Sequence, residues 1–199
     1  MSDARKPRLG VLLSGSGRTL ENLCEYIANG SYLDAVIAVV VGSRACLGIE
    51  KAAARGIPHR VIPGELSGKQ LDGLVEEFGL DLVVLAGYLR RVPITAKTRG
   101  RILNIHPALL PDFGGPGMHG MHVHRAVIEA YQRGEVSRSG CTVHYCDETY
   151  DTGAVILQRR CRVTDEDTPE SLAAKVFELE CEAYPEAISR VLAGLKESR

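Results

Sequence analysis

The chain has 199 residues, of which 45% are apolar and 25% charged, and its formal net charge at pH 7 is −1. This composition is ordinary for a globular protein of one domain, and the near-neutral charge argues against broad nucleic-acid binding. No apolar run approaches the roughly 20 residues of a membrane span. Residues 1–7 are polar, lack a signal-peptide pattern and are expected to form a flexible leader. We therefore expect a cytoplasmic protein, with no membrane or nucleic-acid partner, in which residues 1–199 form a single domain.

Strand and helix patterns alternate through the first two thirds of the chain. The expected strands are 8–13, 35–41, 59–62, 81–86 and 101–106, and the expected helices are 19–29, 46–55 and 68–78. This rhythm predicts an α/β fold with a doubly wound, mostly parallel sheet, Rossmann-like in its N-terminal half, with helices on both faces. Ligands of such sheets bind beyond the carboxyl ends of the strands.

The last third has a different pattern. We expect a helix at 123–133, two strands at 141–146 and 154–163 joined by a turn, and a long final helix that begins at Thr168. Thr168 suits the N-cap, and Pro169 suits the first helical position. Pro185 is expected to kink or break this helix.

A glycine-rich loop, Ser14 to Thr19, follows the first strand and opens a helix. Backbone N–H groups at such a helix start favour a phosphate, and glycines allow its close approach. The dinucleotide fingerprint would need a third small residue where Leu20 stands, so a single phosphate is favoured over NAD. The same glycines also suit a tight turn in any α/β fold.

Asn104 and His106 end the strand at 101–106, just before Pro107. Residues two apart on a strand project from one face, so an amide and an imidazole are expected to share one crevice. The amide can hold the oxygen of a polarised carbonyl, and the imidazole can take or give a proton near pH 7. A carboxylate such as Asp151 can orient the imidazole and raise its pKa. Taken singly, each of these residues also fits an ordinary loop or turn.

The segment Asn104-Ile-His-Pro-Ala-Leu-Leu-Pro111, together with Asp151-Thr-Gly-Ala-Val-Ile-Leu-Gln158, resembles the folate-dependent formyltransferases. The resemblance covers the chain from Leu9 to about Leu192. It implies transfer of a formyl group from 10-formyltetrahydrofolate to the amine of glycinamide ribonucleotide, without a metal. The loop from Phe113 to Met121 is longer and richer in glycine than the family pattern.

The resemblance also implies roles for individual residues. Asn104, His106 and Asp151 match the catalytic trio, with a protonated His106 holding the developing oxyanion. The remaining matches are Gly17, Arg18 and Thr19 for the 5′-phosphate, Glu180 for the glycinamide ribonucleotide, and Leu89, Arg90, Arg91 and Val92, with Asn104, for the folate.

Two of these assignments have local alternatives. Glu180 lies on an apolar stripe at helical spacing, with Val176 and Ala183, so it needs a partner, which is either the ligand or an arginine. Arg90 and Arg91 could neutralise anionic ligands, or they could be solvated surface residues.

Four histidines admit a metal site as an alternative, since His122-x-His124 is a possible ligand pair and His119 and His144 could join it. The six cysteines include no Cys-x-x-Cys pair, which favours reduced thiols. Competing functions of the same family are related chemistry on methionyl-tRNA or an amino sugar, and hydrolysis of formyltetrahydrofolate. A non-catalytic nucleotide-binding module and a metallohydrolase are the alternatives of a different class. The enzyme that acts on methionyl-tRNA usually carries a further carboxyl-terminal domain. The hydrolase of formyltetrahydrofolate usually carries an extra domain ahead of this one. We expect a monomer or a homodimer.

Overall fold

The computed structural model describes residues 5–30 and 33–197, and the sequence-predicted alternation of strands and helices is present. In chain order the elements are β1 (Arg8–Leu13), α1 (Arg18–Ala28), β2 (Val36–Gly42), α2 (Leu47–Ala54), β3 (His59–Val61), α3 (Gly68–Phe78), β4 (Leu82–Leu85), β5 (Ile102–His106), α4 (Met121–Gln132), β6 (Arg138–Tyr145), β7 (Val155–Arg162) and α5 (Pro169–Glu197).

The strands form one sheet in the order β3-β2-β1-β4-β5-β6-β7. β1 pairs in parallel with β2 and β4, β2 pairs in parallel with β3, and β6 pairs with β7 in the antiparallel direction. The predicted fold class, an α/β fold with a mostly parallel sheet, is therefore confirmed. The chain divides into two compact units: unit 1 contains the chain up to Leu103 and from Ile188 onward, and unit 2 is Asn104–Ala187. That the whole chain is one domain stays a prediction.

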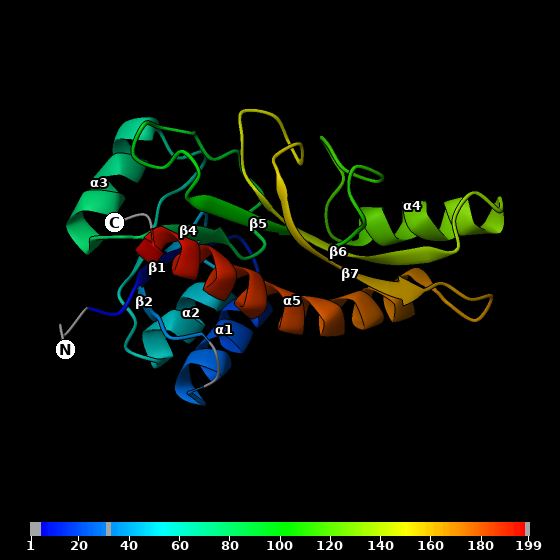
Figure 1. Cartoon of the computed structure of the whole chain (residues 1–199), viewed down its shortest axis with the longest axis horizontal. Helices are drawn as coiled ribbons and strands as arrows, with labels where there is room; N and C mark the ends of the chain where they lie inside the picture. Colours follow the sequence, from blue (N-terminus) through cyan, green and yellow to red (C-terminus); the bar gives the residue numbers. More distant parts are fainter. Residues whose placement is uncertain (1–4, 31–32, 198–199) are drawn as a thin grey trace. The chain divides into compact units, whose positions relative to one another are not determined.

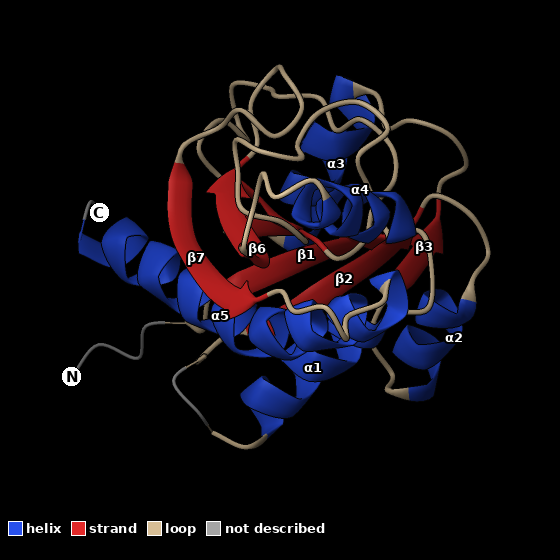
Figure 2. Ribbon diagram, turned by 90° about the vertical axis from the view of Figure 1, so that its right-hand side faces the viewer, coloured by secondary structure: helices blue, strands red, loops and turns tan. Residues whose placement is uncertain are grey.

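In unit 1, helices cover both faces of the strands. Figures 1 and 2 show α1 and α2 on one face and α3 on the other. The starts of α1 and α2 meet at two glycines, where a Cβ on Gly17 would lie 2.6 Å from the Cα of Gly48. Gly17 also has a φ of 73°, which favours glycine. These two glycines hold the loop after β1 against the start of α2.

The bounds of α3 agree with the prediction because its ends carry strong local signals. Ser67 and Gln70 form a capping box at the start of α3. Gly79 ends the helix in the left-handed conformation, with a φ of 56°.

In unit 2, α4 covers one face of the β6–β7 pair and the first part of α5 covers the other (Figures 1 and 2). Three α5 side chains, Leu172, Val176 and Ala183, are fully or almost fully buried. Two predictions in this unit were wrong. β6 begins at Arg138 rather than Cys141, because Gly140 belongs to the strand: a Cβ there would lie 1.9 Å from the carbonyl oxygen of Arg159.

The predicted break at Pro185 does not occur, and α5 runs through it to Glu197. Tyr184 and Ala187, on either side of the proline, have no exposed surface. Burial of this apolar face stabilises the helix by more than the loss of one backbone hydrogen bond destabilises it.

The hydroxyl of Thr142 on β6 holds the chain that follows β5. It donates to the carbonyl of Ala108 at 2.7 Å, accepts from the amide of Leu110 at 3.0 Å and accepts from the side-chain amide of Gln158 at 2.9 Å. One donor and two lone pairs are thereby all used. Gln158 also donates to the carbonyl of Leu110 at 3.0 Å.

We expect Thr142→Val to lower the free energy of unfolding by about 3 kcal/mol, because it leaves buried backbone groups without partners. Urea unfolding followed by circular dichroism measures the change. Thr142→Ser is the matched control, since it keeps the hydroxyl and removes one methyl group, for a loss of about 1 kcal/mol. Equal losses in the two variants would contradict the assignment.

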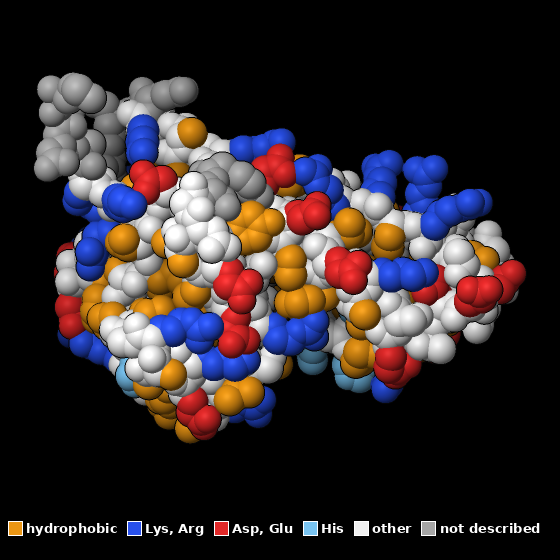
Figure 3. Space-filling model, turned by 90° about the horizontal axis from the view of Figure 1, so that it is seen from below, with side chains coloured by type: hydrophobic (Ala, Val, Ile, Leu, Met, Phe, Trp, Pro, Cys, Tyr) orange, Lys and Arg blue, Asp and Glu red, His pale blue; other side chains and the backbone are white. Residues whose placement is uncertain are grey.

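The distribution of charged side chains on the surface agrees with the near-neutral net charge of the chain. On the face drawn in Figure 3, Lys and Arg side chains are interspersed with Asp and Glu side chains. Within residues 5–30 and 33–197, no helix has both the length and the apolar character needed to cross a membrane. Of the predicted leader, residues 1–4 lie outside the described residues, Arg5 and Lys6 pair with Asp81 and Asp34, and Pro7 is buried.

Candidate active site

Unit 2 contains a cluster of four polar side chains, Asn104, His106, His144 and Asp151, which we call the polar cluster. Nδ1 of His106 lies 3.6 Å from Oδ2 of Asp151, and Nε2 of His144 lies 3.5 Å from Oδ1 of the same carboxylate. Nδ2 of Asn104 lies 3.2 Å from Nε2 of His144. The three residues matched to the catalytic trio are thus brought together, and His144 joins two of them.

His144 was not among the predicted catalytic residues, although the sequence offered a signal for it. It follows Thr142 by two, so both side chains project from the same face of β6. The β6–β7 register shifts between Val143 and His144. The extra residue of this irregularity, Ile156, is on β7, opposite the part of β6 from which His144 meets Asn104 and Asp151.

Backbone carbonyls fix the proton positions on both imidazoles. Nε2 of His106 lies 2.8 Å from the carbonyl oxygen of Phe113, and Nδ1 of His144 lies 2.8 Å from the carbonyl oxygen of Tyr145. A carbonyl only accepts, so these ring nitrogens carry the protons. The other nitrogen of His144, Nε2, faces both Nδ2 of Asn104 and Oδ1 of Asp151, so this ring contacts both side chains.

The Asp151-Thr-Gly153 motif lies beside the imidazole rings of His106 and His144. Asp151 has a φ of 57°, and its Oδ2 accepts from the amide of Gly115 at 2.9 Å. A Cβ on Gly153 would lie 1.8 Å from the carbonyl oxygen of Tyr145, the atom that holds His144. The motif therefore supplies the carboxylate of Asp151, and the absence of a side chain at Gly153 leaves room for the carbonyl of Tyr145.

The pKa values of Asp151 and His106 depend both on the burial of these side chains and on the contacts between the members of the polar cluster. Burial opposes ionisation of Asp151, but contacts with His144, the Gly115 amide and His106 outweigh it and hold the pKa of this carboxyl below its usual range. For His106, burial is the largest effect and lowers the pKa, although Asp151 and the Phe113 carbonyl each act to raise it. Asp151 thus acts to raise the pKa of His106, as expected from the sequence, but burial has the larger effect, and the resting ring is neutral near pH 7.

A third buried histidine lies near the two in this cluster. His124, in the first turn of α4, is 5% exposed, and its Nδ1 has no hydrogen-bond partner among the described residues. Burial, and next the charge that His106 can carry, lower the pKa of His124. α4 begins at Met121, two residues before the predicted start.

We expect the free energy of unfolding to fall as the pH is lowered through about 6.5, because the unfolded chain then binds protons that the folded His106 and His124 do not. Each ring contributes up to about 1.4 kcal/mol per pH unit between its unfolded and folded pKa values. Urea unfolding at a series of pH values measures the slope. His124→Gln should show a shallower slope, and an unchanged slope would contradict this account.

The other predicted site residues lie in unit 1, except Glu180. The loop after β1 and the chain after β4 are joined at Ser14, whose amide donates to the carbonyl of Gly87 at 3.0 Å and whose hydroxyl accepts from the amide of Leu89 at 3.0 Å. The phosphate-loop residues Gly17, Arg18 and Thr19 therefore share the carboxyl edge of adjacent strands with residues 89–92. Nε of Arg44 donates to the carbonyl of Ser14 at 2.8 Å and adds a cation there.

The side chains of residues 88–92 differ widely in exposure. Leu89 is 53% exposed, Arg90 and Arg91 are exposed, and Val92 is buried. The hydroxyl of the neighbouring Tyr88 is buried without a hydrogen-bond partner among the described residues. An exposed leucine beside a buried, unpaired hydroxyl is consistent with a surface that a ligand covers.

Glu180 is half-buried on α5. It lies close enough to Cys141 to contribute to the rise in that thiol's pKa, to about 12, of which burial is the largest cause. Cys141 and Thr142 are consecutive on β6, so their side chains lie on opposite faces of this strand.

No group of three or more His, Cys, Asp or Glu side chains suited to a metal ion occurs within residues 5–30 and 33–197. His119 and His122 contact each other edge to face, with ring centroids 5.7 Å apart. His124 and His144 have the separate surroundings described above. That no metal binds stays a prediction.

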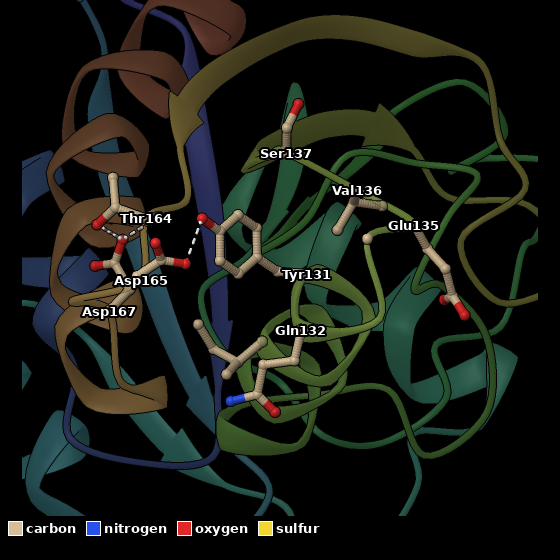
Figure 4. A pocket seen from close by; sticks show the side chains of 10 residues that line it. Tyr131, Gln132, Glu135, Val136, Ser137, Thr164, Asp165 and Asp167 are labelled. Carbon is tan, nitrogen blue, oxygen red and sulfur yellow. Dashed lines mark hydrogen bonds between the residues drawn. The ribbon is translucent and has the colours of Figure 1, made fainter.

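A separate cavity of about 760 Å³ is lined by residues of the end of α4 and of the chain before α5. Figure 4 shows the hydroxyl of Tyr131 directed at Asp165, to which it donates at 3.0 Å, and Asp167 held by Thr164. This cavity shares no residue with the polar cluster, and its acidic groups have protein partners.

A family model described as formyl transferase matches residues 7–188. The chain belongs to the formyl transferase family. Among the relatives of this chain, the phosphoribosylglycinamide formyltransferase, chloroplastic, of Arabidopsis thaliana is 38% identical over 198 residues, or 95% of the chain. The protein of the same name from Vigna unguiculata is 39% identical over 193 residues, or 92% of the chain. The chain spans 66% and 60% of the lengths of these two relatives.

Solved structures also resemble this chain. Glycinamide ribonucleotide transformylase 1 from Geobacillus kaustophilus is 32% identical, with a TM-score of 0.80 over 94% of this chain and 100% of that one. The enzyme of the same name from Symbiobacterium toebii is 34% identical, with a TM-score of 0.80 over 95% of this chain and 92% of that one. The whole fold is therefore that of the family.

Proposed function

We propose that the chain is a phosphoribosylglycinamide formyltransferase of purine biosynthesis, which transfers a formyl group from 10-formyltetrahydrofolate to the amine of glycinamide ribonucleotide. The observation that carries the proposal is the polar cluster, in which an amide, two imidazoles and a carboxylate converge in a chain of this family. The names of the relatives favour this acceptor over methionyl-tRNA or an amino sugar.

The chemistry needs an oxyanion donor and a group that moves one proton. The amine attacks the formyl carbon, and an N–H of Asn104 stabilises the oxygen that becomes negative, an effect typically worth about 3 kcal/mol per donor. His106, neutral at rest, takes the proton that the attacking amine loses and returns one to the departing folate nitrogen. Asp151 stabilises the imidazolium that exists between these two transfers.

Binding residues follow from the family match and from the local structure. The backbone amides at Gly17, Arg18 and Thr19, at the start of α1, are suited to the 5′-phosphate. Residues 89–92 are suited to the folate, and the carboxylate of Glu180 to a hydroxyl or amine of the ribonucleotide. Cytoplasmic location, the absence of a metal and a monomeric or homodimeric state remain predictions.

An absorbance assay with a 10-formyl folate analogue tests the function. We expect deformylated product only when glycinamide ribonucleotide is present. Equal rates without the ribonucleotide would instead indicate a hydrolase that uses water as the acceptor. Replacing the ribonucleotide with an amino sugar or with methionyl-tRNA tests the remaining alternatives, and turnover with either one alone would overturn the choice of acceptor.

A further inference from the structure

The short segment Phe113-Gly114-Gly115 contacts His106 at its first residue and Asp151 at its last. The carbonyl of Phe113 accepts from Nε2 of His106 at 2.8 Å, and the amide of Gly115 donates to Oδ2 of Asp151 at 2.9 Å. The side chains of His106 and Asp151 are only 4% and 10% exposed. One short segment therefore sets the surroundings of both groups.

The backbone of this segment is tightly constrained. Phe113 has a φ of 56°, which a residue with a side chain adopts only when its surroundings impose it. A Cβ on Gly114 would lie 2.6 Å from Cδ2 of Leu110 and 3.2 Å from Cβ of Asp151. Leu110 is in turn held by Thr142 and Gln158. The direction of the Phe113 carbonyl is thus fixed by packing on two sides.

This carbonyl leaves the neutral His106 ring one arrangement of its proton. Because Nε2 must donate, Nδ1 carries the lone pair. Nδ1 lies 3.6 Å from Oδ2 of Asp151, which is too long for a direct hydrogen bond. A proton that reaches Nδ1 creates an imidazolium beside the carboxylate, with both ring N–H groups facing acceptors.

We propose that the carbonyl of Phe113 is a positioning group that holds His106 in the Nε2–H tautomer, so that Nδ1 is the atom that receives the proton of the attacking amine. The proposal rests on the proposed formyl transfer. The amine nitrogen forms its bond to the formyl carbon and loses one proton to Nδ1. That proton then passes to the folate nitrogen as its bond to the carbon breaks, and the ring returns to its starting state.

Nitrogen-15 NMR of the imidazoles in the full chain tests the tautomer without any substitution. At pH 8 the His106 ring is neutral, and we expect a protonated Nε2 and an unprotonated Nδ1. A protonated Nδ1, or an even mixture of the two forms, overturns the proposal. The assignment of the signals uses the spectrum of His106→Ala, from which the His106 pair is missing.

Gly114→Ala tests whether the segment maintains this state. The added methyl group must displace Leu110 or the backbone at 113–115, so we expect a lower proportion of the Nε2–H form and a roughly 10-fold lower kcat, with KM values little changed. Gly73→Ala, on α3 with no atom within 4 Å of the added Cβ, is the matched control and should leave both measurements unchanged. Near-ultraviolet circular dichroism checks that both variants are folded.

An unchanged tautomer together with an unchanged kcat in Gly114→Ala overturns the positioning role. The failure of the proposed function gives a different result: no formyl transfer to the ribonucleotide by the unsubstituted chain, whatever the tautomer of His106. A lower kcat in Gly114→Ala with an unchanged tautomer also contradicts the proposal, because the loss would then come from another effect of the substitution.

Discussion

Asp151→Asn is expected to lower kcat about 1,000-fold, within the range for loss of a group that supports proton transfer. The carboxylate faces both His106 and His144, at 3.6 and 3.5 Å, and accepts from the amide of Gly115. An asparagine keeps the size of the side chain but cannot stabilise an imidazolium with a full negative charge. Steady-state kinetics with saturating folate and ribonucleotide give the value.

The matched control for this substitution is Asp165→Asn, which removes a carboxylate from the separate cavity, where it accepts from Tyr131. Its kcat should stay within about 2-fold of that of the unsubstituted chain, as expected for a surface change far from the chemistry. If Asp151→Asn were as active as this control, the carboxylate would have no part in the reaction.

His106→Ala is expected to lower kcat by about 1,000-fold or more, because it removes the group that moves the proton between the two nitrogen atoms. The ring is 3% exposed, so the substitution also leaves a cavity, with a loss of about 2 kcal/mol in the free energy of unfolding. Kinetics and urea unfolding on the same preparation separate the two effects.

His59→Ala is the control, since His59 is an exposed histidine on β3 that contacts only the carbonyl of Ile57 among the contacts recorded for it. We expect nearly unchanged turnover. Added imidazole should partly restore His106→Ala if the missing ring acts as a proton carrier. Equal turnover in His106→Ala and in the control would show that the chemistry proceeds without His106.

The strands of the parallel sheet and most helix bounds followed from local patterns, because buried parallel strands have continuous apolar sequences and α3 carries both of its caps. The start of β6 and the continuity of α5 did not, since both depend on tertiary packing: Gly140 is needed because another strand approaches it, and Pro185 is tolerated because its neighbours are buried. Local sequence propensities cannot predict either of these packing contacts.

The sequence predicted three residues of the candidate site, but it did not predict the contacts of His144 or the lowered pKa of His106. Asn104, His106 and Asp151 could be named from motif and spacing, and the structure brings them together. The participation of His144 depends on a register shift in a strand pair, and the low pKa of His106 depends on burial exceeding a favourable charge. Both are outcomes of the folded chain that no single segment encodes.

The glycine at 153 restricts how this hairpin can vary. Any side chain there would collide with the oxygen that secures His144, whereas Glu148, Thr149 and Tyr150 are exposed. A selection from a randomised library of positions 148–153 should therefore recover only glycine at the last position and diverse residues at the first three. The turn can therefore vary in length and chemistry at the exposed residues 148–150, whereas Gly153 must be kept.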